Sequence, residues 1–293
     1  MTDLSKIRII RQAHPDINVH QPFDIAWEYQ YGPMEEFQGD MHYALQLCIV
    51  LHGSMEVIFS NHRREFSAGQ AYWMMFWEPH AFRFTGHRNF AVAINIELDH
   101  LGNCDPFGGC DWMLPFVVPP KLRYCPKTSV EKRIFQETGK SLFKTWNSKQ
   151  ANWKQSSWLQ IHQLILEALR GLSNINQETG WMSEASNNFI KIKPALDMVR
   201  KSSGKPPSLK DASEICCLSQ SRFSDVFKHV FHVSFGKFAA RARLASAARD
   251  LAQNREMIEE IAEKWGFFDN SHFTHAFKAL YGCTPKQYRE NPT

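Results

Sequence analysis

Short polar side chains recur at helical spacing in two segments near the C-terminus, 220–228 and 270–278, and each segment ends in a lysine. Such side chains can hydrogen-bond base edges in the major groove of DNA, while basic groups hold the phosphates. The residues that we predict to contact DNA are Gln220, Ser221, Arg222, Ser224, Asp225, Lys228, Asn270, Ser271, His272, Thr274, His275 and Lys278.

A polar stripe on one helix is usually only its solvent-facing side. Here the stripe occurs twice, and it lies in the basic part of the chain. Residues 187–293 contain 17 Lys/Arg and 11 Asp/Glu, whereas residues 1–186 carry a net charge of −2. A basic domain with two matched polar helices favours a double-stranded DNA partner.

The two polar segments belong to an internal repeat. Segment 213–238 resembles segment 262–288, with Cys217 opposite Gly266 and His232 opposite Gly282. Two copies of one supersecondary unit are the simplest explanation. Each copy has the apolar periodicity of a helix, a tight turn and a second helix.

Turn and capping residues define the second copy most clearly. Gly266 is predicted to end the first helix in the left-handed conformation, and Asp269 or Asn270 to cap the second. Gly282 is predicted to end the second helix, and Pro285 to open the next one. The aromatic residues between these positions are therefore predicted to be core.

This C-terminal region, from about 187 to 293, resembles the DNA-binding domain of the AraC/XylS family of bacterial transcription regulators. The motif that carries the resemblance comprises Ile261-Ala262, Gly266-Phe267, Asp269, Ser271, Phe273, Phe277-Lys278, Gly282, Thr284-Pro285 and Tyr288-Arg289. The resemblance implies that two recognition helices enter successive major grooves, reading base blocks about 10 base pairs apart.

Three residues depart from the family pattern. The family often has arginine where His275 stands, glycine where His232 stands, and a basic or amide residue where Asp225 stands. A carboxylate at 225 cannot strengthen general phosphate affinity, but it can accept a hydrogen bond from a cytosine amino group. Asp225 is therefore predicted to determine sequence preference.

Residues 43–98 have the composition of short strands separated by turns, which predicts a sandwich or barrel. Gly53, Gly69 and the sequence 78–82 resemble the family's cupin-like effector domain, a small barrel. A barrel mouth can hold one small ligand.

We predict that the barrel of this protein binds a sugar or related polyol through aromatic and polar side chains. The predicted ligand-binding residues are His42, Trp73, Trp77, Glu78, His80, Phe82 and Asn95.

Two other functions are compatible with the N-terminal half. The aromatic residues could simply fill the barrel of a regulator without an effector, whose first domain dimerises or binds a protein. A metal-dependent cupin enzyme usually carries a His-x-His motif, which is absent here, and His42, His52 and His80 are widely separated. We therefore expect no enzymatic activity, no cofactor and no metal.

Helical periodicity starts near Thr128, and the apolar stripe over 152–172 fits either packing on the barrel or dimerisation. Residues 173–188 have the composition of a linker.

The seven scattered cysteines, including Cys104, argue against a disulfide framework. No signal peptide or membrane-length apolar run is evident, so we expect a cytoplasmic protein.

The sequence thus predicts an α+β multidomain protein with three parts. These are a cupin-like β-barrel over 1–125, a helical dimerisation or linker segment over 126–185, and an all-α domain with two helix-turn-helix units over 186–293. The expected partners are double-stranded DNA, a small-molecule effector, a second copy of the chain and, if the protein is an activator, RNA polymerase.

Overall fold

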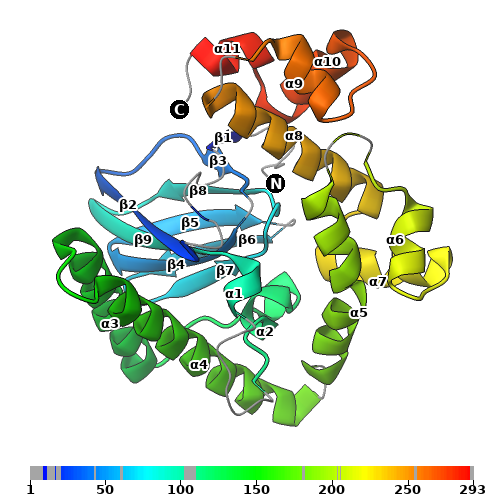
Figure 1. Cartoon of the computed structure of the whole chain (residues 1–293). Coiled ribbons are helices and arrows are strands. Elements are labelled where there is room, and N and C mark those ends of the chain that lie inside the picture. Colours follow the sequence, from blue (N-terminus) through cyan, green and yellow to red (C-terminus); the bar gives the residue numbers. More distant parts are fainter. Residues whose placement is uncertain are drawn as a thin grey trace.

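The computed structural model describes residues 9–11, 17, 21–42, 44–59, 62–101, 110–179, 182–202, 204, 206–253 and 256–290. An N-terminal β region is followed by long helices that cross beneath it, and then by a helical C-terminal region (Figure 1). In the described part of the chain no helix is long and apolar enough to cross a membrane.

The β region consists of two sheets. The five-stranded sheet has the order β1 (Ile9–Arg11), β3 (Gln38–Asp40), β8 (His80–Phe84), β5 (Ser54–Phe59) and β6 (His62–Ser67). The four-stranded sheet has the order β2 (Phe23–Tyr31), β9 (Arg88–Ile96), β4 (Leu45–His52) and β7 (Ala71–Met74). All pairs are antiparallel except β1 with β3, which is parallel.

The predicted closed barrel is wrong, because no described strand joins the two sheets into one hydrogen-bonded ring. Local sequence patterns indicate strands but not which distant strands pair, and closure depends on that pairing. The predicted strand region began too late as well. Strand β2 precedes it and pairs with β9 along its whole length, from Phe23 opposite Ile96 to Tyr31 opposite Arg88.

Strand β4 is buried on both faces, which explains its nearly continuous apolar sequence. Leu47 and Ile49 belong to the core shared with the helices, whereas Cys48 and Val50 belong to the core between the two sheets. The period of two along a strand sends alternate side chains to these two cores.

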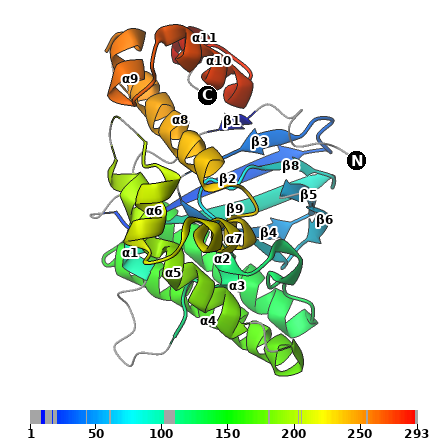
Figure 2. The ribbon, with the colours of Figure 1, turned by 90° about the vertical axis from the view of Figure 1, so that its right-hand side faces the viewer.

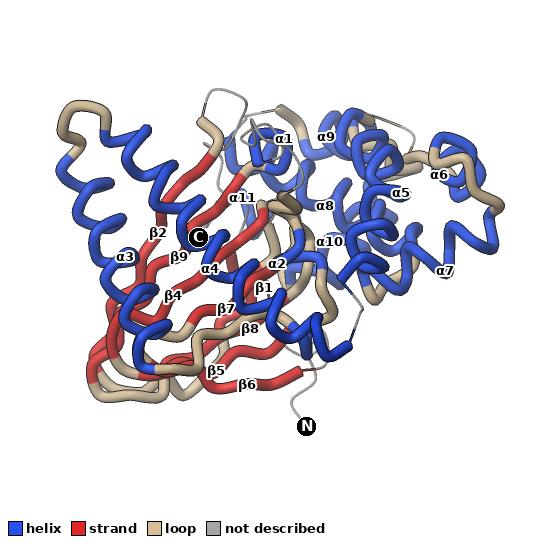
Figure 3. Tube along the Cα trace, turned by 90° about the horizontal axis from the view of Figure 1, so that it is seen from below, coloured by secondary structure: helices blue, strands red, loops and turns tan. Residues whose placement is uncertain are grey.

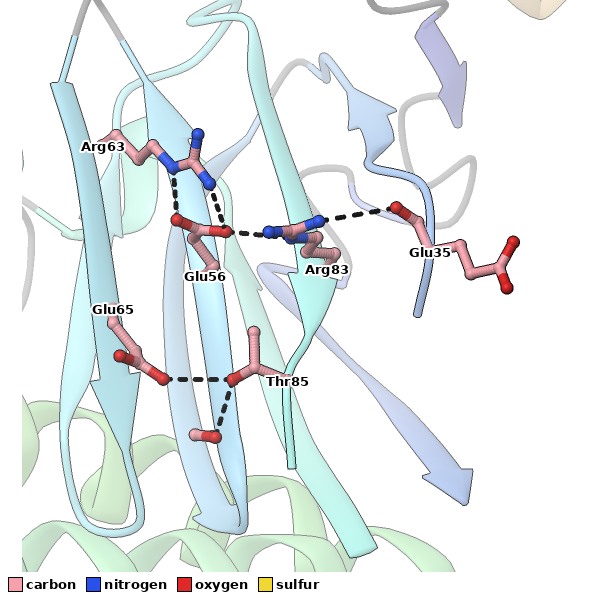
Figure 4. Close-up of polar contacts among 7 residues, drawn as sticks. Glu35, Glu56, Arg63, Glu65, Arg83 and Thr85 are labelled. Atoms are coloured by element: carbon pink, nitrogen blue, oxygen red, sulfur yellow. Dashed lines mark hydrogen bonds and ion pairs between the residues drawn. The ribbon is translucent and has the colours of Figure 1, made fainter. Parts of the chain in front are cut away.

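The outer face of the five-stranded sheet is polar. Glu56 forms ion pairs with Arg63 and Arg83, and Thr85 donates a hydrogen bond to Glu65 (Figure 4). These exposed cross-strand pairs orient the opposite face of the same strands toward the interior.

Helices cover the other face of the four-stranded sheet (Figure 3). They are α1 (Leu98–Leu101), α2 (Leu114–Val117), the 3-10 helix η2 (Pro120–Leu122), α3 (Ser129–Ser148) and α4 (Trp153–Thr179). A capping box between Thr128 and Glu131 starts α3. The apolar stripe of α4, including Ile161, Leu164 and Ile165, is fully buried within the chain's own core. That stripe is therefore not free to form a dimer interface.

Helix α5 (Met182–Lys201) corrects the predicted linker over 173–188. Helix α4 continues to Thr179, and α5 begins three residues later. Phe189 and Ile192 of α5 lie in the large hydrophobic core, so tertiary packing stabilises a helix where the composition suggested a loop. The predicted break near 202–208 is confirmed, because α5 ends at Lys201 and the next helix starts at Leu209.

The C-terminal region contains α6 (Leu209–Ile215), α7 (Gln220–Phe231), α8 (Phe235–Gln253), α9 (Ile258–Lys264), α10 (Asn270–Tyr281) and α11 (Pro285–Glu290). Two short helix pairs, α6–α7 and α9–α10, are joined by α8, which runs from one to the other (Figure 2). The predicted repeat of two helix-turn-helix units is confirmed.

Candidate DNA-binding and sensor sites

The first helix-turn-helix unit presents the polar face of α7. Ser219 caps this helix by accepting a hydrogen bond from the Arg222 amide at 3.3 Å. Phe223, Val226 and Phe227 are buried, which turns Arg222, Asp225 and Lys228 outward.

The second unit repeats this construction on α10. Asp269, one of the two predicted caps, accepts a hydrogen bond from the His272 amide at 2.6 Å. Gly266 and Gly282 have φ values of +69° and +71°, which confirms that both helices end in the left-handed conformation. Phe273 and Phe277 are fully buried in the core of this unit.

The twelve side chains that we predict to contact DNA lie on the outward faces of these two helices. Ser224 and Thr274 are partly buried, and the other ten are exposed. Helix α8 separates the two faces and has 19 residues, so it spans about 28 Å at 1.5 Å per residue. That length is of the order of one turn of B-DNA, about 34 Å.

The two units differ at their turns. Where the second unit has Gly266 and Gly282, the first has Cys217 and His232 with φ values of +54° and +57°. A side chain with a Cβ atom strains the backbone in this region. The backbone of the first unit is therefore strained at Cys217 and His232, whereas glycine avoids this strain in the second unit.

Both units pack against the β region. Trp77, in the loop between β7 and β8, contacts Phe238 with ring centroids 5.0 Å apart, and Phe76 contacts Phe231 at 5.7 Å. Trp77 itself has a φ of +53°, which is rare for so bulky a residue. On the other side, Met41 is fully buried in the core of the second unit. The chain therefore connects the β region to each unit through a separate apolar contact.

The predicted ligand-binding residues do not all gather in one place. Trp73 faces the helices, where its ring contacts Phe116 and its Nε1 donates a hydrogen bond to the Tyr124 carbonyl. Trp77 lies at the contact with the first helix-turn-helix unit. Glu78 forms a buried ion pair with Arg123 at 2.8 Å.

Four of the predicted residues lie on or near the inner side of the sheets. Phe82 belongs to the core between the sheets. Asn95 accepts a hydrogen bond from Gln46 at 3.0 Å, and both residues are buried. His42 and His80 lie together, with ring centroids 5.3 Å apart. Gln46 was missed by the sequence analysis, although its position on β4 opposite Asn95 on β9 makes it a direct partner.

A buried cluster forms where β3 meets β8. Asp40 is paired in register with His80, and His42 follows two residues after Asp40. One possible ligand atom from each of these three residues lies within 4.8 Å of the other two. Asp40 was not among the predicted site residues, but the Asp-x-His spacing is a signal for it, because residues i and i+2 project on the same side of an extended chain.

The described cysteines form no disulfide. Six are free, and Cys104 lies outside the described residues. Burial raises the pKa of the Cys48 thiol to about 12, so this side chain stays protonated and packs as a small apolar group.

Comparison with known proteins identifies the C-terminal region. A family model described as a helix-turn-helix domain matches residues 212–291, which are the two units. The regulator AlkR of Acinetobacter baylyi is 25% identical over 128 residues, which cover 43% of this chain and 41% of AlkR. The solved structure of ToxT from Vibrio cholerae superposes over 92% of this chain and 98% of ToxT, with a TM-score of 0.55 and 11% identity.

The C-terminal region is that of an AraC/XylS-family protein. An uncharacterised helix-turn-helix regulator of Haemophilus influenzae is similar over the full length, at 21% identity with 99% of each chain covered. The similarity to AlkR, in contrast, spans about two fifths of that protein. The superposition on ToxT extends over the β region as well, and it shows a shared fold.

Proposed function

We propose that this AraC/XylS-family protein is a sequence-specific transcription regulator whose DNA contacts come from α7 and α10. The observation that carries the proposal is the pair of matched units, each with a buried aromatic face and an exposed polar face. In this arrangement the N-terminal end of each second helix enters a major groove.

Charged residues on α7 have different roles in this proposal. Arg222 and Lys228 are exposed and bind phosphate oxygens, which strengthens binding to any sequence. Asp225, also exposed, accepts a hydrogen bond from a cytosine amino group and so contributes to sequence preference.

Binding assays on α7 variants test these roles. A preferred site is first selected from random duplexes, and the affinity is then measured by fluorescence anisotropy at several salt concentrations. Arg222→Ala should weaken binding to selected and scrambled duplexes alike and lower the salt slope by about 1. Arg249→Ala, an exposed arginine on α8, is the matched control and should change neither value.

The role of Asp225 has its own test. Asp225→Ala should alter the ranking of duplexes that differ at one base pair, by about 1–3 kcal/mol at that position. Equal loss of affinity on every duplex would contradict the role in sequence preference. Failure of the wild-type protein to select any sequence would contradict the proposed function itself.

We further propose that the β region binds a small-molecule effector, with a carbohydrate as the first candidate. The buried polar pair Gln46–Asn95 on the four-stranded sheet, and His80 and Phe82 on β8 of the other sheet, support this choice, since sugars are bound by hydrogen-bonding groups beside aromatic rings. Trp73 and Trp77 do not add support, because one packs on helices and the other on α8. A change in the contacts of the β region with the two units would link effector binding to DNA binding, provided that the two arrangements bind the effector differently.

Thermal unfolding of the full chain tests the effector. A sugar that binds the folded state should raise Tm in proportion to the logarithm of its concentration. An unsaturated fatty acid is a useful comparison, because a structure of ToxT carries one. If neither class shifts Tm, the regulator without an effector, whose N-terminal region binds a protein or a second copy, becomes the better proposal.

A homodimer is the proposed assembly, formed by the outer face of α4. Leu159 is 71% exposed and Leu166 is 38% exposed, and the seven-residue spacing puts both on one side of the helix. Leu159→Lys together with Leu166→Lys should convert a dimer to a monomer in sedimentation analysis. A wild-type monomer at working concentrations, or an unchanged dimer in the double variant, would contradict this interface.

A further inference from the structure

The cluster of Asp40, His42 and His80 has the donor set of a transition-metal site. Two imidazoles and one carboxylate are a common three-ligand set for zinc or ferrous iron, and they leave coordination positions open. The three residues are 6%, 1% and 2% exposed. We propose that Asp40, His42 and His80 bind one divalent first-row transition metal ion.

The hydrogen bonding of His80 supports metal binding. Its Nδ1 lies 3.0 Å from the carbonyl oxygen of Glu78, and a carbonyl can only accept, so Nδ1 is the protonated nitrogen. In a neutral ring this leaves a lone pair on Nε2, which faces the cluster. A metal-ligating histidine usually donates its other N–H to a carbonyl or carboxylate in this way.

The carboxylate of Asp40 completes the geometry. Its Oδ2 lies 3.9 Å from Nε2 of His80, which is too long for a hydrogen bond. Its Oδ1 is buried and accepts no hydrogen bond within the described residues. A metal ion between the carboxylate and the imidazole nitrogen would stabilise both groups in this buried space.

The distances are compatible with coordination after a small contraction. The three candidate atoms lie within 4.8 Å of one another. Ligand atoms on a tetrahedral zinc are about 3.4 Å apart, given bonds of about 2.1 Å. Asp40 and His80 are the end residues of paired strands, and residues 41–42 belong to no helix or strand, so side-chain rotation and a modest backbone shift can close the gap.

The proposed metal site lies beside the contact between the β region and the second helix-turn-helix unit. Asp40 and His42 flank Met41, whose side chain is fully buried in the core of the second helix-turn-helix unit. Burial is the main cause that raises the pKa of Tyr288 on α11, and the nearby charge of Asp40 adds to this shift. A bound ion would therefore fix the segment of the β region that contacts the second unit, near the place where β3 approaches that unit in Figure 1.

Cobalt titration of the full chain, after removal of metals with a chelator, tests the site without reference to DNA binding. Co²⁺ should bind one per chain with visible d–d absorption, and Zn²⁺ should displace it. Asp40→Asn, His42→Gln and His80→Gln should each weaken binding about 100-fold or more, since even outer-shell changes cost 10–100-fold. His52→Gln replaces an exposed histidine outside the cluster and should bind like the wild type.

Circular dichroism of the metal-free variants shows which of them fold, and Asp40→Asn is nearly isosteric. In addition, Zn²⁺ should raise the Tm of the wild type and of His52→Gln, but not that of the three cluster variants. Absence of stoichiometric binding would overturn the proposal. Equal affinity in all variants, or a thiolate-to-cobalt band in the near ultraviolet, would also overturn it.

Discussion

Two residues of the first helix-turn-helix unit, Cys217 and His232, hold conformations that glycine adopts in the second unit. The left-handed conformation costs a non-glycine residue roughly 1–2 kcal/mol. Replacement by glycine removes this cost but adds about 0.4–1 kcal/mol of chain entropy to the unfolded state. We therefore expect Cys217→Gly and His232→Gly each to raise the free energy of unfolding by about 0.5–1 kcal/mol in urea denaturation.

The reverse substitution provides the control. Gly282→Ala should lower the free energy of unfolding by about 1 kcal/mol or more, because it adds the same strain to the second unit. A loss of stability in Cys217→Gly would show that the thiol's contacts outweigh the backbone strain.

His162 on α4 should make stability depend on pH. Its ring lies between Trp112 and Trp158, with centroids 4.8 and 4.4 Å away, and the residue is 8% exposed. Burial lowers its pKa below 6.5, although a hydrogen bond with the Trp158 carbonyl partly opposes this shift. The unfolded chain therefore binds more protons than the folded chain, so the free energy of unfolding should fall as pH drops below about 6.5.

Chemical denaturation between pH 7.5 and 5 measures this effect. His162→Gln should flatten the decline, whereas His229→Gln, at an exposed position on α7, should leave it as in the wild type. An identical pH profile for His162→Gln and the wild type would show that other groups cause the loss.

At the scale of elements, a small residue decides how closely α4 approaches the segment between η2 and α3. Gly171 on α4 lies against Tyr124, and a Cβ atom there would be 2.0 Å from the ring carbon Cε2. The ring is packed beside Phe135 and cannot move away freely. Gly171→Ala should therefore destabilise the protein by about 1–3 kcal/mol through overpacking.

Gly236 provides a matched control for this prediction. It lies in the first turn of α8, and a Cβ atom there would meet nothing within 4 Å. Gly236→Ala should leave the free energy of unfolding unchanged or raise it by up to about 1 kcal/mol, because alanine favours the helix. Equal effects of the two substitutions would mean that helix propensity, and not contact with Tyr124, determines the outcome at Gly171.

At the scale of the whole molecule, the loop that carries Phe76 and Trp77 joins the β region to the first unit. The ring of Trp77 is 5% exposed and contacts Phe238. Trp77→Ala removes this contact, and it should increase hydrogen exchange in α7 and α8 while β4 and β9 remain protected.

Trp27→Ala is the control for the loop, because Trp27 lies on β2 and is 43% exposed. It should leave exchange in α7 and α8 unchanged. Uniformly faster exchange in Trp77→Ala would indicate global destabilisation, and no change would show that the first unit is held by other contacts.

The helix-turn-helix units were predictable from sequence because their determinants are local. Gly266, Asp269, Gly282 and Pro285 mark turns and caps within a few residues of the helices that they end or start, and the aromatic periodicity defines the buried faces. Repetition of the pattern at Phe223 and Phe227 strengthened the same prediction.

Tertiary structure alone decided the β region, because strand pairing joins residues that are far apart in the sequence. Pairing of β2 with β9 and of β3 with β8 produced two sheets and not a barrel, and it brought Asp40 beside His80 across 40 positions. Which side of a strand an aromatic residue occupies follows from the same register. Trp73 therefore packs on helices, and Phe82 lies between the sheets.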